Sequence, residues 1–201
     1  MMIMLKRMYT KEEFANSIVN KLNSLRLSGR DGVHTFSLNN AIASVAKEFG
    51  ISTWAKGLIT SDNSSDDVTH ISGHEWLYDL VCYRYGNEHY ALNDTILVME
   101  SEWKGKRYTP NNNDEEDPYG EVKFDFQKLL LANADIKLMV YKEHRTGKNY
   151  NLNGYFIRRI NEYRQGKASD YFLFACYSPR MKGDKKWSIS AYSKDKEWID
   201  L

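Results

Sequence analysis

Acidic side chains interrupt two apolar stretches of this 201-residue chain. Glu100 and Glu102 lie at the end of the stretch 96–103, and Asp79 lies within the stretch 76–81. Because successive side chains of a strand point to opposite faces, Glu100 and Glu102 project from the same side. Two neighbouring carboxylates resist burial unless a cation, a basic side chain or water compensates their charge. The pattern therefore predicts a site for a divalent cation.

Asp79 joins this acidic set if its strand pairs with the strand that carries Glu100. The same alternation places Glu75 on the face of Asp79, so we expect three or four carboxylates to converge. Oxygen ligands without histidine or cysteine favour a hard cation, Mg²⁺ or Mn²⁺, which is held by few carboxylates together with water and substrate phosphate. This composition points to the hydrolysis of phosphodiester bonds.

The elements that position these acids follow from hydrophobic periodicity and turn signals. A capping box at Thr10 and Glu13 starts the first helix, and Ser37 is expected to cap the second. Helices are predicted over residues 10–26, 37–50, 121–134 and 152–166. Strands are predicted over residues 68–71, 76–85, 95–103, 136–142, 171–177 and 186–192. This order predicts an α/β fold, a three-layer-like sandwich with a mixed central sheet.

Three segments of the sequence resemble the PD-(D/E)XK nuclease superfamily. They are HEWLYDL at 74–80, ILVMESEW at 96–103 and DFQKLL at 125–130. The resemblance implies a restriction-endonuclease-like αβββαβ core, which agrees with the order of elements expected above. It also implies that Asp79 is the metal-binding aspartate and that Glu100 is the first acid of the strand signature. Glu102 stands where the family has its lysine, an ExE variant that some restriction enzymes of the superfamily use.

The departure at Glu102 leaves the catalytic lysine of the family to be supplied from elsewhere. Other members supply it from the following helix, and Lys128 is the matching candidate. Lys104, two residues beyond Glu102 on the same strand face, is the alternative. An ordinary surface ion pair with Asp125 is the competing interpretation of Lys128. The family often carries a glutamate on the first helix of its core, for which Glu48 is an accessory candidate.

Basic residues are concentrated in the last third of the chain, although the net charge of the whole is only +1. Residues 142–196 contain 13 Lys and Arg against five Asp and Glu, so this segment carries +8 and the remainder −7. A basic surface beside an acidic site suits a polyanion, while solvated lysines on exposed faces are the alternative. We expect nucleic acid as the partner, DNA in preference to RNA, and the sequence leaves a homodimer open. The expected phosphate-binding residues are Arg158, Arg159, Arg164, Lys182, Lys185 and Lys186.

The length of the chain suits a single domain. N-terminal helices (1–60), a nuclease-like core (68–141) and a basic C-terminal part (142–201) follow one another in it. The two cysteines lack the spacing of a zinc or redox site. No stretch approaches the roughly 18 apolar residues of a membrane helix, and no signal sequence is recognisable. These observations predict a cytoplasmic protein with no membrane partner.

Other interpretations remain compatible with the sequence. Residues 42–58 have a faint helix-turn-helix pattern, which would make the chain a DNA-binding module. A nuclease-fold protein that has lost catalysis is a further alternative, because the strand lysine is missing. At the level of single residues, Asp79 can be read as a turn acid, and Glu100 and Glu102 as a solvent-facing pair on an edge strand.

Overall fold

Seven strands form one mixed sheet in the part of the chain that the computed structural model describes, namely residues 10–28, 31–55, 77–86, 92–104, 117–144, 152–181 and 185–201. The strands are β1 (Ser52–Ala55), β2 (Leu80–Tyr85), β3 (Leu92–Glu102), β4 (Ile136–Lys142), β5 (Tyr171–Tyr177), β6 (Trp187–Ser193) and β7 (Lys196–Asp200). They lie side by side in sequence order. β3, β4 and β5 run parallel, and the other neighbouring pairs are antiparallel.

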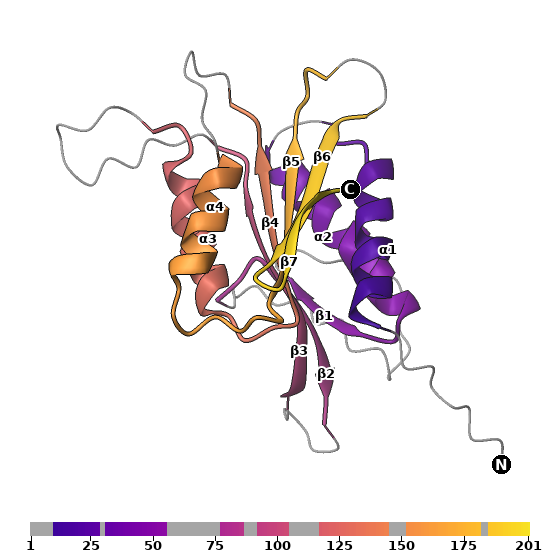
Figure 1. The fold of residues 1–201 in the computed structure, drawn as a ribbon. Helices are drawn as coiled ribbons and strands as arrows, with labels where there is room; N and C mark the ends of the chain where they lie inside the picture. Colours follow the sequence, from indigo (N-terminus) through magenta and orange to yellow (C-terminus); the bar gives the residue numbers. More distant parts are fainter. Residues whose placement is uncertain are drawn as a thin grey trace.

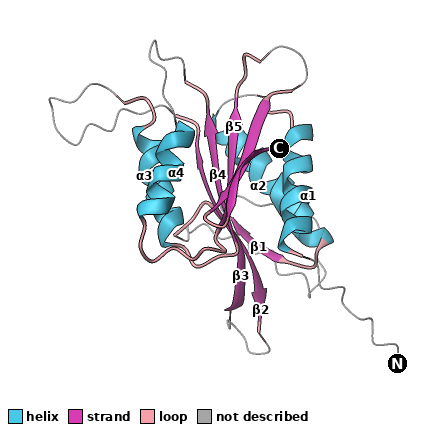
Figure 2. Cartoon of the chain, in the orientation of Figure 1, coloured by secondary structure: helices cyan, strands magenta, loops and turns pink. Residues whose placement is uncertain are grey.

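Helices cover both faces of the sheet, as Figure 1 shows. α1 (Lys11–Ser24) and α2 (Asp31–Glu48) lie on one face, and α3 (Gly120–Leu131) and α4 (Leu152–Glu162) lie on the other (Figure 2). α3 and α4 each connect two parallel strands, and successive crossovers of the same hand put both helices on one face. The expected α/β sandwich with a mixed central sheet is therefore present. No helix in the described segments has the length and apolar character needed to span a membrane.

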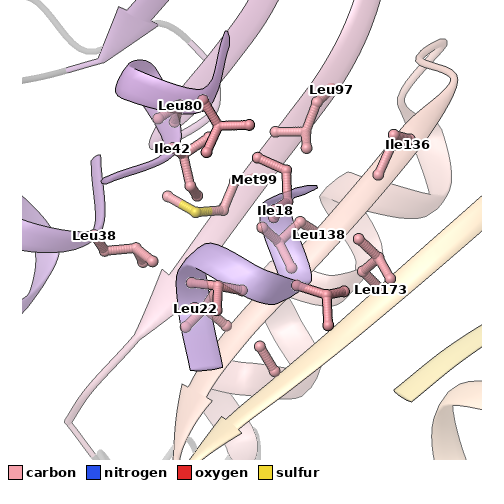
Figure 3. Packing of buried hydrophobic residues seen from close by; sticks show 14 of the residues in the cluster. Ile18, Leu22, Leu38, Ile42, Leu80, Leu97, Met99, Ile136, Leu138 and Leu173 are labelled. Atoms are coloured by element: carbon pink, nitrogen blue, oxygen red, sulfur yellow. The ribbon is translucent and has the colours of Figure 1, made fainter. Parts of the chain in front are cut away.

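A separate apolar core fills each side of the sheet. On the side of α1 and α2, Ile18 and Leu22 of α1 pack with Leu97 and Met99 of β3, as Figure 3 shows. Val98 of β3 points the other way and joins the core beneath α3 and α4. The alternation along β3 is thus fixed by burial on both faces. It directs Glu100 and Glu102 to the side of α3.

The predicted start of α1 is confirmed, and that of α2 is wrong. Thr10 caps α1, since its side chain accepts a hydrogen bond from the Glu13 backbone and the Glu13 side chain accepts one in return. α2 begins at Asp31, six residues before Ser37. Its buried stripe starts one turn early at His34, whose ring packs edge-on at 5.2 Å from that of Trp103. The buried face of α2 therefore begins with His34, a polar residue that the apolar pattern did not include.

The helix-turn-helix interpretation is wrong at the residues that would form its second helix. Gly50 follows α2 with a positive φ of 66°, and the chain then enters β1. β1 pairs antiparallel with β2, which makes it the first strand of the sheet. The predicted strand at 68–71 lies outside the described residues. Among the described strands, β1 is the one that pairs with β2 on the side away from β3.

A buried ion pair lies near the beginning of β4 and β5, on the face of the sheet that α3 and α4 cover. Lys137 of β4 is only 1% exposed, and its Nζ lies 2.8 Å from Oδ2 of Asp170. The same oxygen accepts a hydrogen bond from the Lys167 backbone at 3.2 Å. Burial lowers the pKa of Lys137, although Asp170 opposes that change. Asp170 is the carboxylate that compensates this buried charge.

Removing Asp170 is expected to destabilise the fold. Asp170→Ala leaves the ammonium of Lys137 buried without its carboxylate, and breaking one side of such a pair costs about 3 kcal/mol of the free energy of unfolding. Urea denaturation measures this loss. Asp135→Ala, which removes an exposed acid just before β4, serves as the matched control and should change stability by less than about 0.5 kcal/mol. Equal effects of the two substitutions would contradict the assignment.

Candidate functional site

Glu100 and Glu102 end the third of the seven strands, so they do not lie on an edge strand. Their strand is flanked by β2 and β4, and Glu100 aligns with Met139 of β4. Glu100 is only 2% exposed. The interpretation of the two acids as a solvent-facing edge pair is therefore wrong. A carboxyl buried in a central strand needs compensation from its neighbours.

Asp79 lies beside this pair, immediately before β2. Leu80 pairs with Met99, which brings Asp79 to the level of Glu100. Oδ2 of Asp79 accepts hydrogen bonds from the backbone N–H of Ser101 at 2.7 Å and from its Oγ at 2.8 Å. The side chain thereby fixes the start of β2 to the end of β3. The predicted approach of Asp79 to Glu100 is close enough for its charge to raise the pKa of Glu100.

Lys128 of α3 reaches the same place from the helical layer. Its Nζ lies 3.5 Å from Oε2 of Glu100 and 2.8 Å from Oδ1 of Asp125. Burial lowers the pKa of Lys128, but Asp125 and Glu100 outweigh that effect, so the pKa lies above its usual value. Lys128 is an ammonium placed between two carboxylates. The surface pair with Asp125 is present, and it accompanies the contact with Glu100.

The electrostatics of Glu100 are dominated by burial. The pKa of its carboxyl is raised to about 9, chiefly by burial and then by the charge of Asp79, while Lys128 opposes the rise. Oε1 of Glu100 is buried and has no hydrogen-bond partner among the residues that the structure describes. Tyr78 borders the same space, since its pKa is raised by burial and then by the charge of Glu100. Within the described residues, one oxygen of this buried carboxyl is thus left without a hydrogen-bond donor.

Glu102 projects from the same face as Glu100 but is engaged differently. Its Oε1 accepts a hydrogen bond from the Lys104 backbone at 2.6 Å. Burial raises the pKa of Glu102, this hydrogen bond lowers it, and Asp125, Glu121 and Asp79 raise it. Lys104 therefore contributes its backbone N–H to the site, and it is Lys128 that brings an ammonium to the acids.

The full convergence of three acids that the sequence predicted is not reached. In the described part of the chain, no three His, Cys, Asp or Glu side chains are arranged to hold a metal ion together. Asp79 and Glu102 each accept a hydrogen bond from a backbone N–H at or just after the end of β3, which engages one oxygen of each. Oε1 of Glu100 is a buried oxygen without a hydrogen-bond partner among the described residues.

The donor set nevertheless fits a hard divalent cation. Mg²⁺ is bound through one or two carboxylates, with waters and substrate phosphate filling its remaining positions. Asp79 and Glu100 supply such a pair, and the orphaned Oε1 of Glu100 is a buried acceptor that a cation would satisfy. Glu102 and Asp125 add further negative charge nearby. Among the described residues, the carboxylates near Glu100 outnumber the ammonium of Lys128, which favours a cation.

Glu48, one of the two accessory acids of the sequence prediction, is not brought to the site. Glu48 is exposed at the last residue of α2, whose buried side chains belong to the core on the opposite face of the sheet. Glu75 lies outside the described residues.

The predicted phosphate-binding residues have different surroundings. Arg158 and Arg164 are exposed on and just after α4, and Arg159 pairs with Glu162 at 2.7 Å. α4 lies on the same face of the sheet as α3 (Figure 1). Lys186 donates to the carbonyls of Pro179 and Met181, which occupies its ammonium. Lys185 is exposed, and Lys182 lies outside the described residues.

Sequence reasoning missed two residues that build the site. Ser101 holds Asp79 through both its backbone N–H and its hydroxyl. Asp125 was considered only as a surface partner of Lys128, yet its charge acts on both Glu100 and Glu102. The signal for Asp125 was its spacing, because residues 121, 125 and 128 lie on one side of a helix. Nothing in the sequence signalled Ser101.

Comparison of the chain with known proteins returns nothing similar. No family model, curated protein or solved structure matches it. Because a fold alone does not determine a function, the function has to be argued from the chemistry of the site.

Proposed function

We propose that this chain is a metal-dependent nuclease of the PD-(D/E)XK type that hydrolyses phosphodiester bonds in nucleic acid, with DNA favoured over RNA. The observation that carries the proposal is the contact of Lys128 with Glu100, at 3.5 Å, beside Asp79. Motif similarity had named these three residues from separate elements. Their approach in space is what a displaced-lysine variant of that site requires.

The proposed roles follow from the surroundings of each side chain. Asp79 and Glu100 hold Mg²⁺ or Mn²⁺, and Glu102 adds charge to the same side. When bound, the cation supplies a Lewis acid for a phosphate oxygen and lowers the pKa of a water molecule. Lys128 keeps its proton and offsets the negative charge that develops on the phosphate during attack.

Affinity for the substrate is assigned to cations away from the acids. Arg158 and Arg164 are exposed around α4, on the face of the sheet that carries the site. Contacts of such residues with phosphates bind nucleic acid without reading its sequence. This division separates the acidic centre, which performs chemistry, from a basic surface, which holds the polymer.

An assay with defined metals tests the proposal. The purified chain is incubated with labelled single-stranded and duplex DNA and with RNA, in Mg²⁺, in Mn²⁺ or in EDTA. We expect cleavage in the presence of either metal and none in EDTA, with Asp79→Ala inactive. Asp135→Asn, an exposed acid at the opposite end of the parallel strands, is the matched control and should retain activity.

The alternative of a catalytically inactive nuclease-fold protein predicts a different result. Such a protein cleaves no nucleic acid, and neither metal changes its melting temperature. If the folded chain cleaves no nucleic acid with either metal, and neither metal raises its melting temperature, the nuclease proposal fails. A metal-dependent rise in melting temperature requires a site in the folded state, because ligands that bind only that state stabilise it by mass action.

A further inference from the structure

Two exposed apolar side chains flank the acidic site. Leu77, two residues before Asp79, is 72% exposed, and Phe124 of α3 is 53% exposed. Phe124 precedes Lys128 by one helical turn, and the Nζ of Lys128 lies 6.0 Å from the centre of its ring. An aromatic ring open to solvent therefore lies next to the ammonium assigned to the phosphate.

Further cations extend from this ring across α3 to α4. The Nζ of Lys123 lies 5.0 Å from the ring centre of Tyr155, and the guanidinium of Arg158 lies 5.9 Å from it. Gln127 donates a hydrogen bond to the Tyr155 hydroxyl at 3.0 Å, which joins the two helices. We call Phe124, Lys123, Tyr155 and Arg158 the α3–α4 surface. Aromatic rings alternate along it with cationic side chains, of which Lys123 is paired with Asp117.

This alternation distinguishes between two forms of nucleic acid. A duplex presents phosphates outward and keeps its bases stacked inside, so it offers no apolar face to an exposed ring beside the site. A single strand offers both, and proteins that bind one combine cations along the backbone with aromatic rings on which bases stack. Base stacking tolerates any sequence because every base has an aromatic face.

We propose that the α3–α4 surface binds single-stranded nucleic acid, with one base stacked on Phe124 while the adjacent phosphate lies at Lys128. Arg158 contacts a phosphate that follows. This inference rests on the proposed function for the role of Lys128 and adds the class of substrate to it. Single-stranded DNA and RNA share this chemistry.

Exposed apolar residues are common on proteins, and α3 provides an internal comparison. Leu131, at the end of the same helix, is 71% exposed. It is one of the apolar side chains that the proposal leaves without a role. Substituting it controls for a general effect of removing an exposed apolar side chain from α3.

Binding in EDTA tests the inference without cleavage. Fluorescence anisotropy is measured with a labelled oligothymidine, an oligouridine, an abasic strand of equal length and a hairpin duplex. We expect both base-carrying single strands to bind more tightly than the abasic strand and the duplex. Phe124→Ala should weaken binding of the base-carrying strands by roughly 5- to 100-fold and leave the abasic strand unchanged. Phe124→Trp should preserve binding, and Leu131→Ala should behave as the unsubstituted chain.

Each outcome separates this inference from the nuclease proposal. An equal loss for abasic and base-carrying strands, tighter binding of the duplex, or no effect of Phe124→Ala overturns the stacking role. Cleavage of duplex that is insensitive to Phe124→Ala leaves the nuclease proposal standing and refutes the inference. Binding that depends on Phe124, with no cleavage and no rise in melting temperature under either metal, supports the single-strand surface and refutes the nuclease.

Discussion

Glu100→Gln abolishes metal-dependent cleavage, with an expected loss of about a thousandfold or more. The substitution keeps the size of the side chain and removes the negative charge that holds the cation. Metal ions contribute several kcal/mol of stabilisation to phosphoryl transition states, which corresponds to losses of this order. Initial rates of cleavage in Mg²⁺ and Mn²⁺ measure the effect, and the melting temperature should no longer rise with metal.

The same substitution should stabilise the metal-free protein at neutral and alkaline pH. The pKa of Glu100 rises from 4.5 to about 9 on folding, chiefly through burial. Between these values the folded state binds more protons than the unfolded state, so the free energy of unfolding falls as pH rises. Glu100→Gln removes this dependence and should add on the order of 2 kcal/mol near the upper end of the window. Denaturation in EDTA across the window measures it.

Asp135→Asn provides the comparison for both effects of Glu100→Gln. It also removes one carboxylate charge, but Asp135 is exposed and lies before β4, away from the end of β3. We expect its activity and its pH profile to match those of the unsubstituted chain. Glu100→Gln with full activity would contradict the metal assignment. An unchanged slope of stability against pH would instead contradict the buried carboxyl.

Lys128→Met reduces the rate of cleavage by about 100- to 1000-fold while the protein remains folded and still responds to metal. Loss of one preorganised group that stabilises developing negative charge typically has this cost. Methionine replaces the aliphatic stem and deletes the ammonium that contacts Glu100 and Asp125. The rate constant at saturating substrate and the metal-induced rise in melting temperature are the two measurements.

Lys104→Met discriminates between the two candidate lysines. The contact of Lys104 with Glu102 is made by its backbone N–H, which the substitution retains. Its rate is expected to stay near that of the unsubstituted chain. If Lys104→Met is the slower variant and Lys128→Met is not, the strand supplies the lysine and the proposed role of Lys128 is wrong.

Two of the central strands, β4 and β5, could be predicted from the sequence to the residue, whereas β3 begins three residues before its predicted start. β4 and β5 match their predicted bounds because both faces of each strand are buried, which leaves continuous apolar runs between polar segments. The strands β1 and β7 at the two edges of the sheet could not be predicted from the sequence. β1 has four residues and lies at the edge of the sheet, and β7 follows a two-residue turn after β6 within a polar stretch. Neither carries a periodic signal long enough to recognise.

The residues of the candidate site could be named from the sequence, but the arrangement of their side chains could be predicted only in part. Alternation along β3 fixed the common direction of Glu100 and Glu102, and the motif after it pointed to Lys128. The arrangement of the carboxylates depends on hydrogen bonds that only the folded chain reveals. Asp79 turns to Ser101, and Glu102 turns to the Lys104 backbone. These local hydrogen bonds compete with the expected convergence of the three carboxylates on one cation.

A lysine carried by α3 and a glutamate carried by β3 belong to different layers of the molecule. The seam between those layers includes Phe126, which is fully buried beneath α3 and contacts the ring of Phe156 of α4. The distance between the Lys128 ammonium and the Glu100 carboxyl is therefore set by how the apolar face of α3 packs on the sheet. Heating that loosens this packing would separate the Lys128 amine from the Glu100 carboxylate. The proposed cleavage activity would then be lost at a lower temperature than that at which the sheet unfolds.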